Sequence, residues 1–143
     1  MYVALFFLSH QNKICEMRKE YSFEDVMTQI NSRSVVMEDR PPKWKFGTLN
    51  YGEVVDMVNK ADGDCWDVFA PGYDRFLDVD VQMPVKNVIG YLKLNNNNHK
   101  IAVQLYQKGF DQERALAEIK RYCFNYTCYA NKNGRWVWVN GFV

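Results

Sequence analysis

The sequence predicts a β-rich α+β fold, with one long helix in the C-terminal half and one short early helix packed outside the strands. Short runs of β-branched and aromatic residues recur between turn signals, and clear helical periodicity appears only late in the chain. No linker or internal repeat divides the 143 residues, and 48% of them are hydrophobic, enough to bury one core. We therefore expect a single domain over residues 1–143, built as a small barrel or sandwich.

Three elements are predicted in the N-terminal part of the chain. Met1–Leu8 is apolar but lacks the basic start and small-residue cleavage site of a signal peptide, so we expect a buried first strand. Ser22 matches a helix N-cap, and the pattern after it predicts a short amphipathic helix to about Asn31. The β-branched segment Ser34–Met37 predicts a strand, which must end before the two prolines that follow Arg40.

Lys43–Phe46 alternates basic and aromatic residues, a pattern compatible with two structures. Aromatic side chains between lysines can bind single-stranded nucleic acid, but alternation also marks a half-buried strand, which we favour. The formal net charge is only +1, from 18 Lys+Arg and 17 Asp+Glu, which argues against nucleic acid as a partner. No apolar run is long enough to span a membrane.

The second half of the chain predicts strands first and then the main helix. Strands are expected at Val79–Val81, Val85–Leu94 and Lys100–Leu105, with the asparagine run at 95–98 forming a hairpin loop. Asp111 matches an N-cap, and apolar residues recur at helical spacing after it until the helix gives way near Tyr126. A turn over residues 131–134 and a closing strand over residues 135–139 follow.

The segment Asp62–Asp67 brings three carboxylates together directly before an apolar run. In an extended segment side chains alternate faces, so Asp64 and Asp67 point the same way only if Gly63 bends the backbone. Such a bend would gather hard oxygen ligands of the kind that suit Mg²⁺ or Mn²⁺. A solvated Asp-Gly turn accounts for the same residues, so the segment alone leaves both interpretations open.

Four ordered blocks occupy about the last two-thirds of the chain. Asn50-Tyr51-Gly52 is followed by Asp62-Gly63-Asp64-Cys65-Trp66-Asp67-Val68, then by Pro84–Leu94 with Lys100–Val103, and finally by Ala117–Phe142. In order and spacing these blocks resemble the soluble family I inorganic pyrophosphatases. The resemblance implies the fold of that family, a small OB-like β-barrel with helices packed outside.

The resemblance also implies an activity, the divalent-metal-dependent hydrolysis of inorganic diphosphate, or of a related diphosphate-containing nucleotide, to phosphate. Asp62 and Asp67 would ligate Mg²⁺, or Mn²⁺ in its place, and Asp64 would help to deprotonate the attacking water. Asn96 and Asn98 stand at two further ligand positions. The implied phosphate-binding residues are Arg40, Tyr51, Lys100 and Tyr126, of which the last three also belong to the implied catalytic set.

Departures from the family pattern fall in the same chemistry. The family carries aspartates where this chain has Asn96 and Asn98, and an amide oxygen can ligate a cation without neutralising its charge. Thr127 stands where the family usually has a lysine. These changes favour an alternative, a catalytically impaired pyrophosphatase-like module that binds a phosphorylated ligand or a protein partner.

Assembly and compartment follow from the same resemblance and from the cysteines. Members of the family commonly form dimers or hexamers, so we expect a homo-oligomer, and an aromatic content of 15% would allow an apolar interface. The four cysteines follow no zinc-ribbon or CxxC pattern, which predicts reduced thiols. The expected compartment is the cytoplasm, of the cell itself or of an infected host cell.

Overall fold

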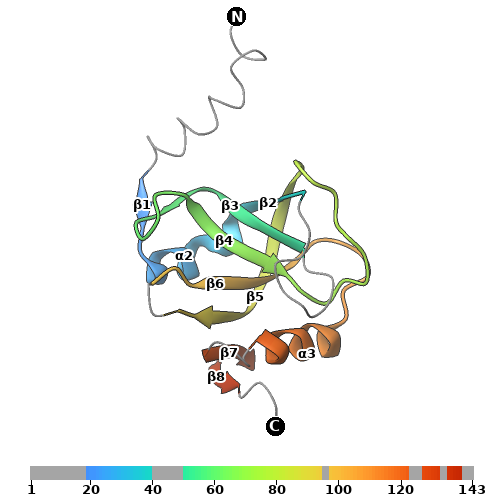
Figure 1. Cartoon of the computed structure of the whole chain (residues 1–143). Helices are drawn as coiled ribbons and strands as arrows, with labels where there is room; N and C mark the ends of the chain where they lie inside the picture. The colour runs from blue at the N-terminus through green and yellow to red at the C-terminus, as the bar shows by residue number, and fades with distance from the viewer. Residues whose placement is uncertain (1–18, 40–49, 95–96, 123–126, 133–134, 140–143) are drawn as a thin grey trace, which may run out of the picture.

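The computed structural model describes residues 19–39, 50–94, 97–122, 127–132 and 135–139 (Figure 1). Within them the elements are, in chain order, β1 (Glu20–Tyr21), α2 (Phe23–Gln29), the 3₁₀ turn η1 (Ile30–Ser32), β2 (Ser34–Met37), β3 (Asn50–Asn59), β4 (Cys65–Ala70), β5 (Gln82–Lys93), β6 (Lys100–Leu105), α3 (Gln112–Tyr122), β7 (Thr127–Lys132) and β8 (Arg135–Val139). The strands predicted at Met1–Leu8 and Lys43–Phe46 lie outside the described residues.

Five strands close into a barrel in the order β2, β3, β4, β6, β5 and back to β2. The β4–β6 pairing is parallel, and the other four pairings in the ring are antiparallel. β1 extends the edge of β3, and the β7–β8 hairpin continues from the far end of β5. The predicted β-rich α+β class is therefore confirmed, and the closed ring is consistent with an OB-like barrel.

The two faces of the barrel wall bury different groups of side chains. Val68 in β4 and Ile101 in β6 point into the main core with the other inward-facing residues, whereas their neighbours Phe69 and Ala102 point outward. The outward pair packs in a second apolar cluster with Ile119 of α3. Side chains alternate faces along a strand, so each wall strand contributes to both clusters. In Figure 1, α3 lies beside this outer wall and next to β7.

Both predicted helix starts are confirmed by their caps. The Ser22 hydroxyl accepts a hydrogen bond from the Asp25 amide at 3.1 Å, and the Asp111 carboxylate accepts from the Arg114 amide at 3.2 Å. α2 ends at Gln29 and continues as η1, close to the predicted end. Neither described helix is long and apolar enough to cross a membrane.

The strand predicted at Val79–Val81 is wrong. Val79 forms only an isolated bridge to Met37, and Asp80 has a left-handed φ of 59°, which ends any extended run. The loop before β5 is held instead by buried side chains. Asn50 accepts from the Leu77 amide at 2.6 Å, and the Tyr73 hydroxyl bonds both backbone groups of β6 residue Leu105, at 3.1 and 3.2 Å.

β3 and the C-terminal hairpin are longer than the sequence patterns predicted. β3 continues through Asn59, well beyond the Asn50-Tyr51-Gly52 block. β7 occupies Thr127–Lys132 and was not predicted, and it includes the first two residues of the turn predicted over 131–134. The closing strand predicted over residues 135–139 is confirmed as β8. The chain after α3 therefore forms a complete hairpin.

Gly52 allows the closest backbone approach in the barrel. It pairs with Met37 across the β2–β3 ladder, and a Cβ at this position would collide with the Val36 carbonyl. We expect Gly52→Ala to lower the free energy of unfolding by about 3 kcal/mol or more, because backbone cannot move aside as a flexible side chain can. Urea unfolding of the purified protein measures the change.

Gly63→Ala is the matched control for this substitution. A Cβ on Gly63 meets nothing within 4 Å, so only its φ of +77° opposes the added methyl group, at a cost of about 1 kcal/mol. A Gly52→Ala protein no less stable than Gly63→Ala would contradict the close approach of β2 and β3.

Candidate functional site

Carboxylates gather on the outer face of β3 and β4. Glu53 and Asp67 are direct partners in the antiparallel ladder, so their side chains lie on the same face. Asp62 and Asp64, in the β3–β4 turn, are close enough to act on the charge of Glu53, as does Glu38 just after β2. We call Glu53, Asp62, Asp64 and Asp67 the acidic face.

Lys100 supplies a positive charge beside the acidic face. Its ammonium forms an ion pair with the Asp67 carboxylate, and both side chains are largely buried, with 10% and 17% of their surface exposed. The pair follows from register, because Val68 and Ile101 are partners in the parallel β4–β6 ladder and the residues before them lie side by side. The two residues that the resemblance assigned to metal and charge balance are thus in direct contact.

Glu53 is the candidate site residue that sequence analysis missed. Burial, as the largest cause, and the charges of Glu38, Asp67, Asp64 and Asp62 together raise the pKa of its carboxyl from 4.5 to about 7. No sequence motif identifies Glu53, because the acids that act on it come from segments that are separate in the sequence. Its one sequence signal is strand alternation, which places it two residues after Tyr51 on the same face of β3.

The β3–β4 turn is built around Asn59, a side chain that is only 2% exposed. Its carboxamide oxygen accepts from the Ala61 amide at 2.9 Å, and its backbone carbonyl accepts from the Gly63 amide at 2.9 Å. Asp62 accepts from the Asp64 amide at 3.0 Å, which makes an Asx turn. The predicted bend at Gly63 is therefore present, with a φ of +77°.

Asn98 connects this turn to the loop between β5 and β6. Its amide nitrogen donates to Asp62 at 3.2 Å, and its amide oxygen accepts from Asn59 at 3.1 Å. A metal bound by both Asn98 and Asp62 would have to share them with these hydrogen bonds. The side chain that the resemblance assigned to metal binding therefore also has a structural role.

Of the remaining predicted site residues, one is described and buried, and the others lie outside the described residues. Tyr51 is 6% exposed and packs in the outer apolar cluster beside Phe69 and Ile119, so most of its ring is buried. Arg40, Asn96 and Tyr126 lie outside the described residues. The acidic face therefore brings together the predicted residues Asp62, Asp64, Asp67 and Lys100.

The carboxylates of the acidic face are the ligand type that a hard divalent cation prefers, although they do not converge on one point. Their mutual repulsion, which adds to the larger effect of burial on the pKa of Glu53, is one that a cation would relieve. Among the described residues, no three acidic, histidine or cysteine side chains converge closely enough to hold a metal by themselves. Mg²⁺ is compatible with such a site, because it binds through one or two carboxylates and keeps several waters.

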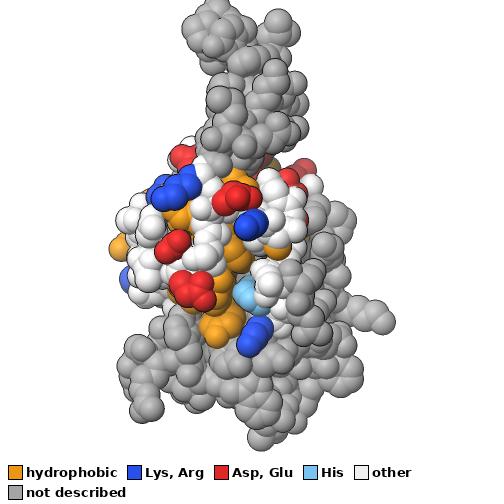
Figure 2. Space-filling model, turned by 90° about the vertical axis from the view of Figure 1, so that its left-hand side faces the viewer, with side chains coloured by type: hydrophobic (Ala, Val, Ile, Leu, Met, Phe, Trp, Pro, Cys, Tyr) orange, Lys and Arg blue, Asp and Glu red, His pale blue; other side chains and the backbone are white. Residues whose placement is uncertain are grey.

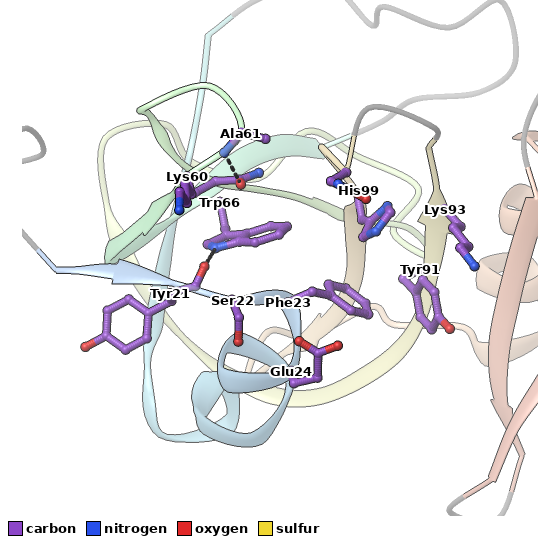
Figure 3. A pocket seen from close by; sticks show the side chains of 12 residues that line it. Tyr21, Ser22, Phe23, Glu24, Lys60, Ala61, Trp66, Tyr91, Lys93 and His99 are labelled. Atoms are coloured by element: carbon purple, nitrogen blue, oxygen red, sulfur yellow. Dashed lines mark hydrogen bonds between the residues drawn. The ribbon is translucent and has the colours of Figure 1, made fainter.

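A pocket of about 560 Å³ opens at one end of the barrel, which we call the mouth pocket (Figure 3). It lies between the start of α2, the β3–β4 turn, the end of β5 and the start of β6. Phe23 occupies its centre, with ring centroids 4.9 Å from Tyr91, 4.9 Å from His99 and 5.9 Å from Trp66. Figure 2 shows apolar side chains on this side of the molecule, bordered by acidic and basic groups.

His99 is neutral in the wall of the mouth pocket. Its Nδ1 accepts from the Leu94 amide at 3.0 Å, so the proton of the neutral ring is on Nε2. Burial lowers the pKa of the imidazole, Lys93 lowers it further, and Glu24 opposes the shift. The side chain is buried, with a relative exposure of 8%.

Comparison with known proteins identifies no relative of this chain. No family model matches the sequence, and neither a curated protein nor a solved structure matches it. The resemblance to family I inorganic pyrophosphatases therefore rests on the four sequence blocks alone and stays a prediction.

Glu53 predicts a particular pH dependence of stability in metal-free buffer. Its pKa is about 7 in the folded protein and near 4.5 in the unfolded chain, so its contribution is fully present below pH 4.5 and is lost as the pH rises through 7. We expect Glu53→Gln to gain thermal stability relative to the wild type as the pH rises from 5 to 8. Melting curves with a chelator present measure the difference.

Glu113→Gln, which removes an exposed acid of α3, is the control for that series. Its melting temperature should differ from that of the wild type by a nearly constant amount over the same pH range. A constant offset for Glu53→Gln as well would show that the Glu53 carboxyl does not titrate in this range.

The Lys100–Asp67 pair predicts coupled effects on stability. Lys100→Met leaves Asp67 largely buried beside Glu53 without its cation and should cost about 3–5 kcal/mol of unfolding free energy. Adding Asp67→Asn removes the stranded charge and should recover part of that loss. A double-mutant cycle by urea unfolding measures the coupling, and strictly additive losses would argue against the ion pair.

Proposed function

We propose that this protein is a divalent-metal-dependent hydrolase of inorganic diphosphate or of a diphosphate-containing nucleotide. The observation that carries the proposal is the acidic face, where burial and neighbouring carboxylates raise the pKa of Glu53 to about 7. Such a concentration of like charge opposes folding, and Mg²⁺ or Mn²⁺ would relieve it. Three of its four carboxylates, Asp62, Asp64 and Asp67, are among the residues that the four sequence blocks imply.

Each residue has a distinct role in this proposal. Asp62 and Asp67 hold the cation, with Glu53 as an added carboxylate beside them, and Asp64 accepts a proton from the attacking water. Lys100 pairs with Asp67 and offsets the charge of the phosphates. A bound cation screens the diphosphate and lowers the pKa of its own water. Arg40, Tyr51 and Tyr126 remain the expected contacts to phosphate oxygens, and Asn96 and Asn98 the expected additional ligands.

A second function is favoured by the hydrogen bonds of Asn98. Its amide bridges Asp62 and Asn59 and so stabilises the acidic turn without a metal. An aspartate at position 98 could not donate to Asp62 and would add charge there. These contacts favour the alternative of a catalytically impaired module that binds a phosphorylated ligand or a protein partner.

The deciding experiment measures phosphate released from inorganic diphosphate with Mg²⁺ or Mn²⁺. We expect turnover by the wild type and a loss of at least a hundredfold in Asp64→Asn and Asp67→Asn, because each removes a carboxylate from the reacting centre. Asp74→Asn is the matched control, since Asp74 is exposed in the loop before β5. Its turnover should equal that of the wild type.

Metal titration separates the two functions. Mg²⁺ should raise the melting temperature of the wild type, and the rise should be smaller in Asp67→Asn, because a ligand of the folded state stabilises it. Stabilisation without phosphate release from diphosphate or nucleoside diphosphates would favour the impaired module. If Mg²⁺ caused no stabilisation and no phosphate were released, the metal-dependent hydrolase would be refuted.

A further inference from the structure

The mouth pocket is separate from the chemistry proposed for the acidic face. Trp66 points into the barrel core, whereas its neighbour Asp67 is on the outer side with Lys100, so the two sites lie on opposite sides of the β4 wall. The pocket volume of about 560 Å³ falls within the range that holds small organic ligands, and barrel mouths are frequent places for such sites.

Aromatic side chains form part of the pocket surface. Phe23 and Tyr91 are half-buried and meet edge to face, while Trp66 is 2% exposed and packs beside Phe23. The indole nitrogen of Trp66 donates to the Tyr21 carbonyl at 3.0 Å, so its polar group is satisfied. Phe23 and Tyr91 therefore offer a surface against which a flat ring can stack.

The charges around the pocket favour an anion. Lys60 and Lys93 are exposed at its rim, and neither forms an ion pair with a described residue. Glu24 is the one acid among the residues that line the pocket, beneath Phe23 in Figure 3. Two cations against one carboxylate disfavour an ammonium ligand, although aromatic rings alone would accept one.

Polar groups inside the pocket can form hydrogen bonds with the edge of a flat ligand ring. His99 lines the pocket, and the Nε2 of its neutral ring carries a hydrogen-bond donor. Glu24 supplies an acceptor on the opposite side of Phe23, so the pocket presents both kinds of hydrogen-bonding group to a ligand.

From these contacts we propose that the mouth pocket binds a mononucleotide, with its base stacked on Phe23 beside Tyr91 and hydrogen-bonded by His99 and Glu24. Its phosphate lies at the rim, where Lys60 and Lys93 on opposite sides of the pocket supply positive charge. Nucleobases are flat and carry both acceptors and donors on their edges. The site requires no metal and does not depend on hydrolysis at the acidic face.

A free nucleotide fits these observations better than a strand of nucleic acid. The base and phosphate are the same chemistry in both, but strand binding needs a groove of cations and several stacking platforms in succession. The described pocket has one aromatic cluster and two lysines at its rim.

The test is calorimetric titration of the full chain with AMP, CMP, GMP and UMP, in a chelator and at low salt. Adenosine and ribose 5-phosphate supply the base and the phosphate separately, and each should bind at least tenfold more weakly than AMP. Because no metal is present and no product is formed, the result is independent of the hydrolase proposal.

Variants then assign the contacts. Phe23→Leu should weaken nucleotide binding by about 5- to 100-fold, and Lys60→Met and Lys93→Met should each weaken it severalfold and reduce its salt dependence. His99→Phe keeps an aromatic ring but removes both the Nε2 donor and the Nδ1 acceptor of the Leu94 amide, and it should also weaken binding. Lys120→Met, on the exposed face of α3, is the control and should bind as the wild type does.

The binding experiments either support or overturn the mononucleotide site. Lys60 and Lys93 are exposed, so their variants test it even where Phe23→Leu does not fold. The absence of nucleotide binding at millimolar concentration, or binding that the pocket variants leave unchanged, would overturn it. Tighter binding of choline than of any nucleotide would also overturn it, and much tighter binding of a single-stranded decanucleotide would overturn the assignment to a free nucleotide.

Discussion

Closure of the barrel depends on β2, a strand of only four residues that pairs with β3 on one side and β5 on the other. Val35 and Val36 take part in both ladders, opposite Val54 and Glu53 of β3 and next to the start of β5. A closed ring leaves none of its strands with an unpaired edge. The same closure turns β3 so that one of its faces lines the core and the other carries Glu53.

The acidic face places two like charges directly opposite each other in the sheet. Glu53 stands directly opposite Asp67 in an antiparallel pair, an arrangement of like charges that destabilises a sheet. Lys100 offsets one of the two charges, while partial burial keeps the pKa of Glu53 near 7. Departures from local consistency concentrate at functional sites in proteins, which is the physical reason to look for function on this face.

The β3–β4 turn belongs to both candidate sites. Lys60 and Ala61 line the mouth pocket, and Asp62 carries the acidic side of the same turn. Asn59 supports both parts, because its side chain bonds Ala61 within the turn and Asn98 across the loop.

Local interactions determined what the sequence alone could predict. The caps at Ser22 and Asp111, the strand Ser34–Met37 and the bend at Gly63 follow from side chains that act on neighbours within a few residues. The β-rich class followed from the repeated short strand patterns. Asp67 and Lys100 were recognised through sequence blocks, but their ion pair required the parallel β4–β6 register.

The tertiary structure alone decided the features that depend on distant segments. Glu53 has no motif, and its pKa results from burial together with charges supplied by β4, the β3–β4 turn and Glu38. His99 is buried beside Phe23, which lies 76 positions earlier in the numbering. Val79–Val81 has a strand pattern but forms only an isolated bridge to Met37, because Asp80 adopts a left-handed conformation. A pattern reports the preference of a segment, whereas charge, burial and pairing depend on which other segments lie beside it.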